Sequence, residues 1–288
     1  MNLRTKKKAE SEMLNSIAIQ HYLFHLSSIA MAQFDYKNLP DSITKEHIER
    51  ILFFEGAGVF CYDDIMDKYI FLSVNPNGKY DLNNEPIYRT GYGQNGFHVD
   101  LTKYDSVILY NNMLKAPTYN TAMFYAQRIA DLQRTFDVNS KALKNPRIFK
   151  GQKKQLETFK QIYEQYDGNT PVIYLSDGLD LDNIFENINV DTPNNLESIN
   201  QAKRELWSEY LNLLGITSTT FQKKERLITD EVSQSLGGAI ANYSTRYKTR
   251  KNCVEQINKM FNLNIEVIDK YEETKIEDTV SDQEGGEE

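Results

Sequence analysis

The chain has 288 residues, of which 40% are apolar and 26% are charged. This length can bury a sizeable core, and the composition is ordinary for a soluble protein. The formal net charge of −8 means that the chain as a whole does not attract nucleic acid through bulk charge.

Charge is concentrated at the two ends of the chain. The basic arm, Arg4, Lys6, Lys7 and Lys8, gives residues 1–8 a net charge of +4. Residues 271–288 carry eight acidic residues and one lysine, a net charge of −7, and we expect a disordered tail there. A basic arm is usually a solvated terminus, but it is also the form that a contact with nucleic acid takes.

The cysteines and the apolar runs favour a protein assembled inside a cell. Cys61 and Cys253 are far apart and form no CxxC pair, which argues against a disulfide framework or a zinc site and fits a reducing compartment. We see no signal peptide, and the stretch Tyr22 to Phe34 is too short and too polar to span a bilayer. We expect no metal and no cofactor.

The first half of the chain predicts two helices and then a β-rich region. Residues 8–36 read as a helix with Leu14, Ile17 and Phe24 along one side. A short helix over 45–54 follows, capped by Ser42 or Thr44. Aromatic and β-branched runs separated by Asn, Gly and Pro then predict a small antiparallel sheet or barrel over 57–112.

The second half predicts three longer helices. One begins at Pro117 and runs to about residue 138. The segment 139–195 is mixed, with a short helix near 155–166 and a strand over 171–175. A helix over 196–214 ends at Gly215, and a hydroxyl-rich loop extends to residue 241. The last helix spans roughly 242–261 and is followed by a strand in NIEVI.

Three short motifs suggest chemistry, but in each case a structural interpretation is preferable. The GxGxxG at 91–96 is followed by strand-like residues rather than a helix, so a hairpin turn is expected. The DDxxD at 63–67 lies between two strand-like runs and is expected to be a solvated turn. His21 and His25 are four apart on a helix, but without a third ligand they are expected to be partly buried structural residues.

The helix over 196–214 has one apolar side. At 100° per residue, a single stripe collects eight of its apolar residues. This stripe comprises Leu196, Ile199, Ala202, Leu206, Trp207, Tyr210, Leu213 and Leu214.

The opposite side of this helix is polar and free of lysine and arginine. Taken alone, it would be read as an ordinary solvated face. It comprises Ser198, Gln201, Glu205, Ser208, Glu209 and Asn212.

Several stretches, in order, resemble the portal (head–tail connector, upper collar) proteins of small short-tailed phages with protein-primed genomes. The similar segments cover most of residues 20–270 and include HYLFHLSSIAMAQFDYKNLP, VILYNNMLKAPTYNT, NQAKRELWSEYLNLLGI, KKERLITDEV and CVEQINKMFNLNIEV. The resemblance implies an α+β portal fold with long stem helices, a small SH3-like β wing, a clip with short strands and a crown helix. On this basis we expect a ring of twelve subunits at one capsid vertex, through which double-stranded DNA is packaged and ejected.

The same resemblance implies a division of the chain. The arm, first helices and wing would occupy 1–116, the first stem helix 117–138, the clip 139–195 and the second stem helix 196–215. A channel loop would follow over 216–241, then the crown helix and strand over 242–270 and the acidic tail over 271–288.

The resemblance also implies roles for individual residues. Loop cations Lys223, Lys224 and Arg226 would touch DNA, and the arm would contact packaging RNA or DNA. Subunit contacts would use the apolar stripes of the stem helices, with Leu206, Trp207 and Tyr210 in the second. The channel wall would be formed by Ser198, Gln201, Glu205, Glu209 and Asn212.

The expected partners are copies of the same chain, the major capsid protein, a lower collar or tail protein and a packaging ATPase, with or without a packaging RNA. No GxxxxGK[ST] motif occurs, so ATP hydrolysis is assigned to a separate motor and the chain is read as non-enzymatic. The alternatives are a small nucleic-acid-binding accessory protein of phage assembly and a metal- or nucleotide-dependent enzyme.

Overall fold

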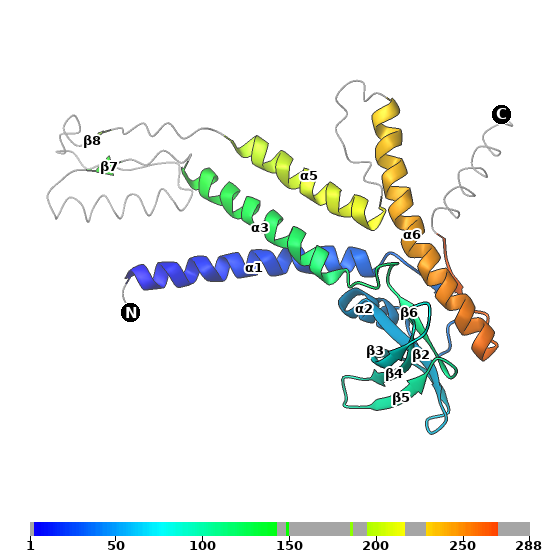
Figure 1. The fold of residues 1–288 in the computed structure, drawn as a ribbon. Coiled ribbons are helices and arrows are strands. Elements are labelled where there is room, and N and C mark those ends of the chain that lie inside the picture. The colour runs from blue at the N-terminus through cyan, green and yellow to red at the C-terminus, as the bar shows by residue number, and fades with distance from the viewer. Residues whose placement is uncertain (1–2, 143–147, 150–184, 187–194, 217–228, 270–288) are drawn as a thin grey trace, which may run out of the picture. The chain divides into compact units, whose positions relative to one another are not determined.

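The computed structural model describes residues 3–142, 148–149, 185–186, 195–216 and 229–269 (Figure 1). The chain divides into two units. The first comprises Met1–Asp131 with Lys203–Glu288, and the second comprises Leu132–Ala202. The fold of the first unit supplies the candidate site, and the two units are treated separately.

The first unit contains a five-stranded antiparallel sheet. Its strands are β2 (Ala57–Asp63), β3 (Lys68–Tyr80), β4 (Pro86–Tyr92), β5 (His98–Thr102) and β6 (Ser106–Tyr110), in the order β5-β4-β3-β2-β6. Side chains of β2 alternate between two apolar clusters, with Phe60 in one and Val59 and Cys61 in the other. The predicted β-rich region is therefore a sheet with both faces covered at its centre.

Two helices pack against this sheet. Helix α2 (Lys45–Glu55) begins at Thr44, whose side chain accepts a hydrogen bond from the backbone N–H of His47, and it ends at Gly56 in the left-handed conformation. Helix α6 (Thr229–Phe261) contacts β6 (Figure 1). The main apolar cluster joins Leu52 of α2, Leu109 of β6 and Ile257 of α6.

The remaining helices of the first unit are α1 (Leu3–Met31), residues 119–131 of α3 (Tyr119–Ala142) and residues 203–214 of α5 (Leu196–Leu214). The predicted apolar face of α3 is buried where this unit contains it, because Ala122, Ala126 and Ile129 have no exposed surface. A two-residue strand β1 (Tyr36–Lys37) pairs antiparallel with β9 (Glu266–Val267), which lies within the predicted terminal strand.

The predicted boundaries fail most clearly at α6. We expected a loop as far as residue 241, but the helix begins at Thr229 and passes through Gly237 and Gly238. The first helix is also displaced, since it ends at Met31 rather than at residue 36. In α6, each glycine costs a helix only about 1 kcal/mol, which the burial of residues such as Ala239 and Tyr243 outweighs. At the end of the first helix, Tyr36 pairs in strand β1 instead of continuing the helix.

In the second unit, the structure describes the C-terminal part of α3, the N-terminal part of α5 and a two-residue pair of strands. These strands are β7 (Ile148–Phe149) and β8 (Phe185–Glu186), which pair antiparallel. The helix predicted near 155–166 and the strand predicted at 171–175 lie outside the described residues. None of the helices in the described part is long and apolar enough to cross a membrane.

Candidate channel wall and the network that anchors it

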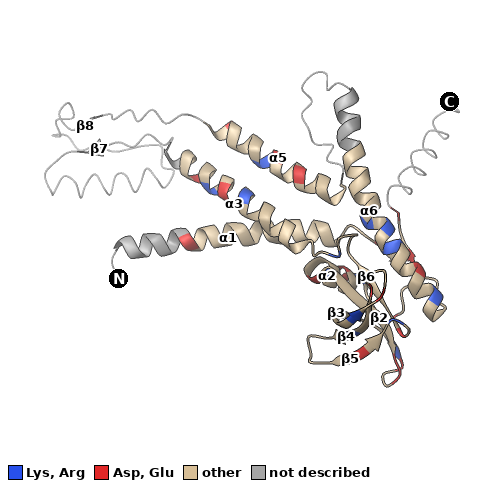
Figure 2. Cartoon of the chain, in the orientation of Figure 1, with Lys and Arg blue, Asp and Glu red and all other residues tan. Residues whose placement is uncertain are grey.

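The predicted channel-wall residues differ in how far they are exposed. In the first unit, Glu205 and Glu209 are exposed, whereas Asn212 is half-buried. Ser198 and Gln201 belong to the second unit and are exposed there. Ser208, which we expected on the solvated face, is only 8% exposed. The polar face that α5 presents within the first unit is therefore narrower than predicted, and its exposed acidic residues are Glu205 and Glu209. Figure 2 colours the acidic residues of α5 red.

Glu209 is tied to α3 through Tyr125. Burial, and after it the hydrogen bond to Glu209, raise the pKa of the Tyr125 hydroxyl to about 12. The two rings of Tyr125 and Tyr210 lie 5.5 Å apart. Glu209 is thus an exposed carboxylate whose position is fixed from the neighbouring helix.

The apolar side of α5 corrects the predicted subunit interface. Tyr210 has no exposed surface, and its hydroxyl donates to the backbone carbonyl of Leu26 in α1 at 3.0 Å. Leu206 is only 9% exposed. These two side chains belong to the interior of the subunit and leave almost no exposed surface for contact with a neighbouring subunit. Trp207 is half-buried and still presents surface.

Helix α5 ends, as predicted, at Gly215. The N–H of Ile216 donates to the carbonyl of Leu211 at 2.8 Å, and the N–H of Gly215 donates to that of Asn212 at 3.0 Å, which together form a Schellman motif. Gly215 has φ 82°, and a Cβ there would lie 2.4 Å from the backbone nitrogen of Tyr243 in α6. Only glycine fits this close crossing of the two helices.

Two side chains, one from the residues just after α1 and one from α6, hold the last carbonyl of α5. The carbonyl oxygen of Leu214 accepts a hydrogen bond from Gln33 Nε2 at 2.6 Å and a longer one from Arg246 Nη1 at 3.4 Å. Arg246 also donates to Gln33 Oε1. Asn242 Nδ2 adds a bond to the carbonyl of Asn212 at 3.0 Å. The point at which the chain leaves α5 is therefore fixed to the end of α1 and to α6.

A second buried arginine extends this arrangement to the sheet. Arg250 is fully buried, and its Nε and Nη2 each donate to one carboxylate oxygen of Glu49 in α2, both at 3.0 Å. The same guanidinium donates to the carbonyl of Asn111 at 2.5 Å and to its Oδ1 at 2.9 Å, and lies 4.0 Å from the ring centroid of Phe34. The Tyr36 hydroxyl donates to Glu49 at 2.6 Å.

We call Gln33, Glu49, Asn111, Arg246 and Arg250 the polar hub. Burial opposes the charge of Arg250, but Glu49 and Tyr36 outweigh it and raise the pKa of the guanidinium. Burial and the neighbouring Arg250 lower the pKa of Arg246. Each charged group in the hub has partners in at least two other segments of the chain. Such fully connected networks rigidify the elements they join.

The hub was not foreseen from the sequence, although α6 carries a signal of it. Its apolar stripe runs through Tyr243, Val254 and Ile257, and Arg246 and Arg250 stand at positions where this stripe would require apolar residues. Arginine in such a stripe indicates a buried partner. The partner of Arg250, Glu49, lies 201 residues away in sequence, so it could not be identified from the pattern.

The predicted DNA-contacting cations fall largely outside the described side chains. Lys223, Lys224 and Arg226 lie between Ile216 and Thr229, outside the described residues. The basic arm of Arg4, Lys6, Lys7 and Lys8 lies in α1, where the structure gives the helix but not these side chains. Both sets of contacts stay predictions.

The other sequence motifs are structural. The GxGxxG is the β4–β5 hairpin turn, as expected, and the DDxxD is the β2–β3 turn, where Asp63 accepts hydrogen bonds from two backbone N–H groups. His21 and His25 are exposed, with ring centroids 4.6 Å apart, so our expectation of partial burial was wrong. Within the described part of the chain, no cluster of three or more His, Cys, Asp or Glu side chains could hold a metal.

An apolar strip of α1 is exposed in the described part of the chain. Phe24 is 69% exposed, Met13 is 56% exposed and Ile17 is 52% exposed. Leu26 and Ala30 of the same helix are buried instead. Ile17 and Phe24 in this exposed strip are two of the residues that the sequence predicted along one side of the helix. Large exposed apolar side chains gathered on one helix indicate a surface that another chain covers.

The chain resembles known portal proteins throughout its length. The family model described as Phage Connector (GP10) matches residues 3–274. The portal and tail structure of native bacteriophage P68 is similar with a TM-score of 0.54 and 16% identity, covering 99% of this chain and 97% of that one. A native gene transfer agent virion matches with a TM-score of 0.45 and 13% identity over 91% of this chain and 85% of that one.

An HK97-family phage portal protein from Corynebacterium diphtheriae matches with a TM-score of 0.39 and 12% identity, covering 87% of this chain and 91% of that one. The bacteriophage P68 structure supports the fold, and the family match spans nearly the whole sequence. The chain therefore belongs to the phage connector (GP10) family.

Proposed function

We propose that this chain is a portal subunit that closes with identical copies, twelve by family resemblance, into a ring at one capsid vertex. DNA passes through the ring during packaging and ejection, and the tail attaches to it. The observation that carries the proposal is the match to the connector family over residues 3–274. The role is structural rather than catalytic.

Ring closure requires two different faces of each subunit to meet, because a heterologous contact repeated around an axis forms a closed ring. The exposed strip of Met13, Ile17 and Phe24 on α1 provides one apolar face. Trp207, half-buried on α5, is retained as a second contact. Leu206 and Tyr210 are withdrawn from the interface, because they are buried inside the subunit.

A channel for DNA must touch a polyanion without retaining it. Each phosphate that a wall neutralises adds to the grip on DNA, so a sliding surface needs few fixed cations. The exposed carboxylates Glu205 and Glu209 on α5 suit such a wall, together with the exposed Ser198 and Gln201. The half-buried Asn212 can contribute only at the edge of this surface.

Cations on the segment after α5 would make the transient contacts. Lys223, Lys224 and Arg226 follow Ile216, whose preceding helix end is fixed by Gln33 and Arg246. A fixed starting point would let the cations that follow it touch DNA without permanent binding. The hub thus supports this role indirectly, by holding α5 in place.

The remaining partners follow from the same assignment. The β sheet, with the N-terminal helices, would face the major capsid protein, and the segment 139–195 would face the lower collar or tail protein and the packaging ATPase. The basic arm would contact packaging RNA, where one is used, or DNA. The subunit would therefore reside in the virion, at the head–tail junction.

Sizing and imaging of the purified chain test the ring. We expect a mass of many subunits by light scattering and rings with a central opening by negative-stain microscopy. Replacing both Ile17 and Phe24 with serine should weaken assembly, because the variant removes an apolar contact surface. Leu82→Ser is the matched control, since Leu82 is fully exposed in the β3–β4 turn. A monomer or dimer from the unmodified chain would favour the accessory-protein alternative.

The DNA contact is tested by Lys223→Ala combined with Lys224→Ala. The double variant should form normal rings but change the retention of packaged DNA, measured as the fraction of particles that keep a full genome. Lys248→Ala, at an exposed site on α6, controls for loss of positive charge elsewhere. Normal packaging and retention in the double variant would contradict the contact.

A further inference from the structure

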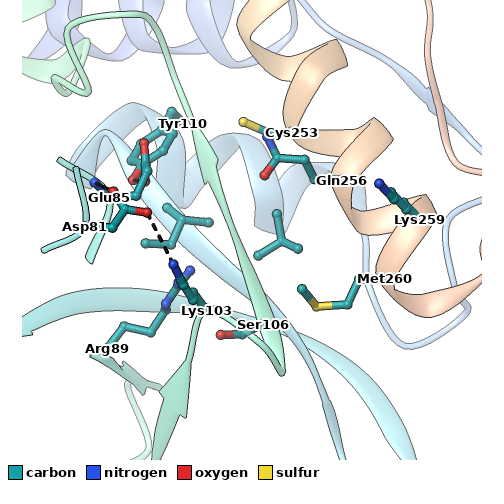
Figure 3. A pocket seen from close by; sticks show the side chains of 12 residues that line it. Asp81, Glu85, Arg89, Lys103, Ser106, Tyr110, Cys253, Gln256, Lys259 and Met260 are labelled. Carbon is teal, nitrogen blue, oxygen red and sulfur yellow. Dashed lines mark hydrogen bonds and ion pairs between the residues drawn. The ribbon is translucent and has the colours of Figure 1, made fainter. Parts of the chain in front are cut away.

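A cavity of about 550 Å³ lies between the sheet and the C-terminal half of α6, within the first unit (Figure 3). Strand β4 contributes Arg89, the β5–β6 turn contributes Lys103, and α6 contributes Gln256 and Lys259. Two carboxylates also line it, Asp81 and Glu85 in the β3–β4 turn. None of these residues takes part in the hub or in the proposed channel wall.

The acceptors in this cavity are already occupied. One oxygen of Asp81 accepts from the backbone N–H groups of Asn83 and Glu85, and the other pairs with Lys103 at 3.5 Å. One oxygen of Glu85 pairs with Lys115 at 2.7 Å, and the other accepts from the Tyr110 hydroxyl at 2.6 Å. These carboxylates therefore offer little to an incoming cation.

The donors are not fully used. Arg89 is only 5% exposed, and its Nη2 donates to the carbonyl of Pro86 at 2.9 Å. Its Nε is buried without a hydrogen-bond partner among the described residues. Burial lowers the pKa of the guanidinium, while Glu85 and Asp105 counter this only through longer-range attraction. Lys259 stands exposed in the last turn of α6, at the rim.

A buried guanidinium with a free N–H is a costly arrangement unless an acceptor arrives. The planar fork of arginine fits a carboxylate with two hydrogen bonds, and lysines at the rim add attraction. We propose that this cavity binds carboxylate side chains, and that its occupant is the acidic C-terminal segment, residues 272–288, of the same or an adjacent copy.

Charge and reach both point to this segment. It contains eight acidic residues and one lysine, the highest density of negative charge in the chain. Nineteen residues follow Asp269, enough for an extended reach of roughly 60 Å. The segment is rooted close to the same helix, since β9 packs against α6. A separate consequence is that the tail would be held away from the channel. Inside the channel, the negative charge of the tail would repel DNA.

Zero-length carbodiimide cross-linking of the full-length protein, followed by mass spectrometry, tests the proposal. The reagent joins a lysine amine to a carboxylate in direct contact. We expect Lys103 or Lys259 to be linked to acidic residues in 272–288 several-fold more often than Lys248, which is exposed on the same helix but does not line the cavity. Mixing isotopically labelled and unlabelled subunits shows whether the linked tail belongs to the same copy or to its neighbour, and either result supports the site.

Arg89→Met gives the decisive comparison. It removes the unsatisfied donor but leaves every cross-linkable lysine in place, so the linkage at Lys103 and Lys259 should fall several-fold. Should this variant fail to fold, about 1 M sodium chloride applied to the unmodified protein should abolish the preference over Lys248, because screening then acts within about 3 Å. Equal linkage at Lys248, no tail linkage at either cavity lysine, or unchanged linkage in Arg89→Met would each overturn the proposal. The test reads contacts within the subunit or between copies, so its outcome is separate from that of the channel function.

Discussion

Arg250 and Arg89 are both buried arginines of the same unit, but their surroundings differ completely. Arg250 is fully buried and paired with both oxygens of Glu49 and with two acceptors of Asn111. The guanidinium of Arg89 makes a single hydrogen bond within the described residues, to the carbonyl of Pro86, and its buried Nε has no described partner. Burial lowers the pKa of Arg89. Burial also acts against the charge of Arg250, but the nearby Glu49 carboxylate outweighs it and the pKa of Arg250 is raised.

This difference distinguishes a buried charge that stabilises the fold from a buried charge that binds a partner. A charge whose donors are all occupied stabilises the elements that it joins, and here Arg250 joins α6 to α2 and to the chain after β6. A charge that keeps a free donor indicates a place where the acceptor comes from elsewhere. By this criterion the hub around Arg250 sets the geometry of the subunit, and the cavity around Arg89 is an interaction site.

The largest expected effect comes from removing the counter-ion of Arg250. Glu49→Gln keeps the side-chain volume but leaves a fully buried guanidinium without a negative partner. Loss of one member of a buried pair costs about 3–5 kcal/mol, so the free energy of unfolding should fall by that amount. Urea unfolding followed by circular dichroism, at fixed protein concentration, measures the change.

Glu46→Gln is the matched control for this variant. Glu46 is an exposed glutamate in the first turn of the same helix, so its replacement should cost no more than about 1 kcal/mol. If the two variants lose similar stability, the hub does not anchor the fold and the contrast between the two arginines loses its basis.

A smaller effect is expected from Tyr36→Phe. The hydroxyl of Tyr36 donates to Glu49 at 2.6 Å, and a hydrogen bond to a charged group contributes about 1.5–3 kcal/mol. Because Tyr36 is half-buried and water can replace part of this bond, we expect the lower end of that range.

The same variant has a pH signature. Burial and then Glu49 raise the pKa of Tyr36 in the folded chain. Above the ordinary tyrosine pKa of about 10, the unfolded chain releases its proton first, so this contribution to stability is lost as the pH rises. Tyr36→Phe should make stability decline less steeply above about pH 10, whereas Tyr104→Phe, at a 78% exposed site, should leave the slope unchanged. Parallel slopes for Tyr36→Phe and the unmodified chain would contradict the assignment.

The sequence predicted best those features that depend on local signals. The caps at Thr44 and at Gly215 give α2 and α5 their ends, because capping hydrogen bonds form between residues only a few positions apart. The turns in the GxGxxG and DDxxD segments were predictable for the same reason. Gly237 and Gly238 misled the prediction of α6, since each weakens a helix by only about 1 kcal/mol and packing overrode that cost.

Features that join distant segments could not be predicted from one sequence. Gln33, Glu49, Asn111 and the two arginines of α6, Arg246 and Arg250, meet only because the fold brings four separate stretches together, and no spacing rule connects those stretches. The amphipathic wheel of α5 identified apolar residues correctly, but it could not say whether a buried face meets the same chain or another. For Tyr210 the answer is α1 of the same subunit, and for Phe24 no cover lies within the described part.

The smallest effect, and the sharpest test of the contrast, is expected from Arg89→Met. Methionine has a similar length and needs no hydrogen-bond partners, so it replaces a poorly satisfied buried charge with an apolar side chain, a change that is often neutral or stabilising. In about 1 M sodium chloride, where carboxylates from the tail are screened beyond about 3 Å, the free energy of unfolding should change by less than about 1 kcal/mol. A loss comparable to that of Glu49→Gln would mean that Arg89 has a set of partners as complete as that of Arg250. The cavity around Arg89 would then have the same structural role as the hub. A small change at high salt, with a larger loss at low salt, would instead locate the missing acceptor of Arg89 on a segment held by charge alone.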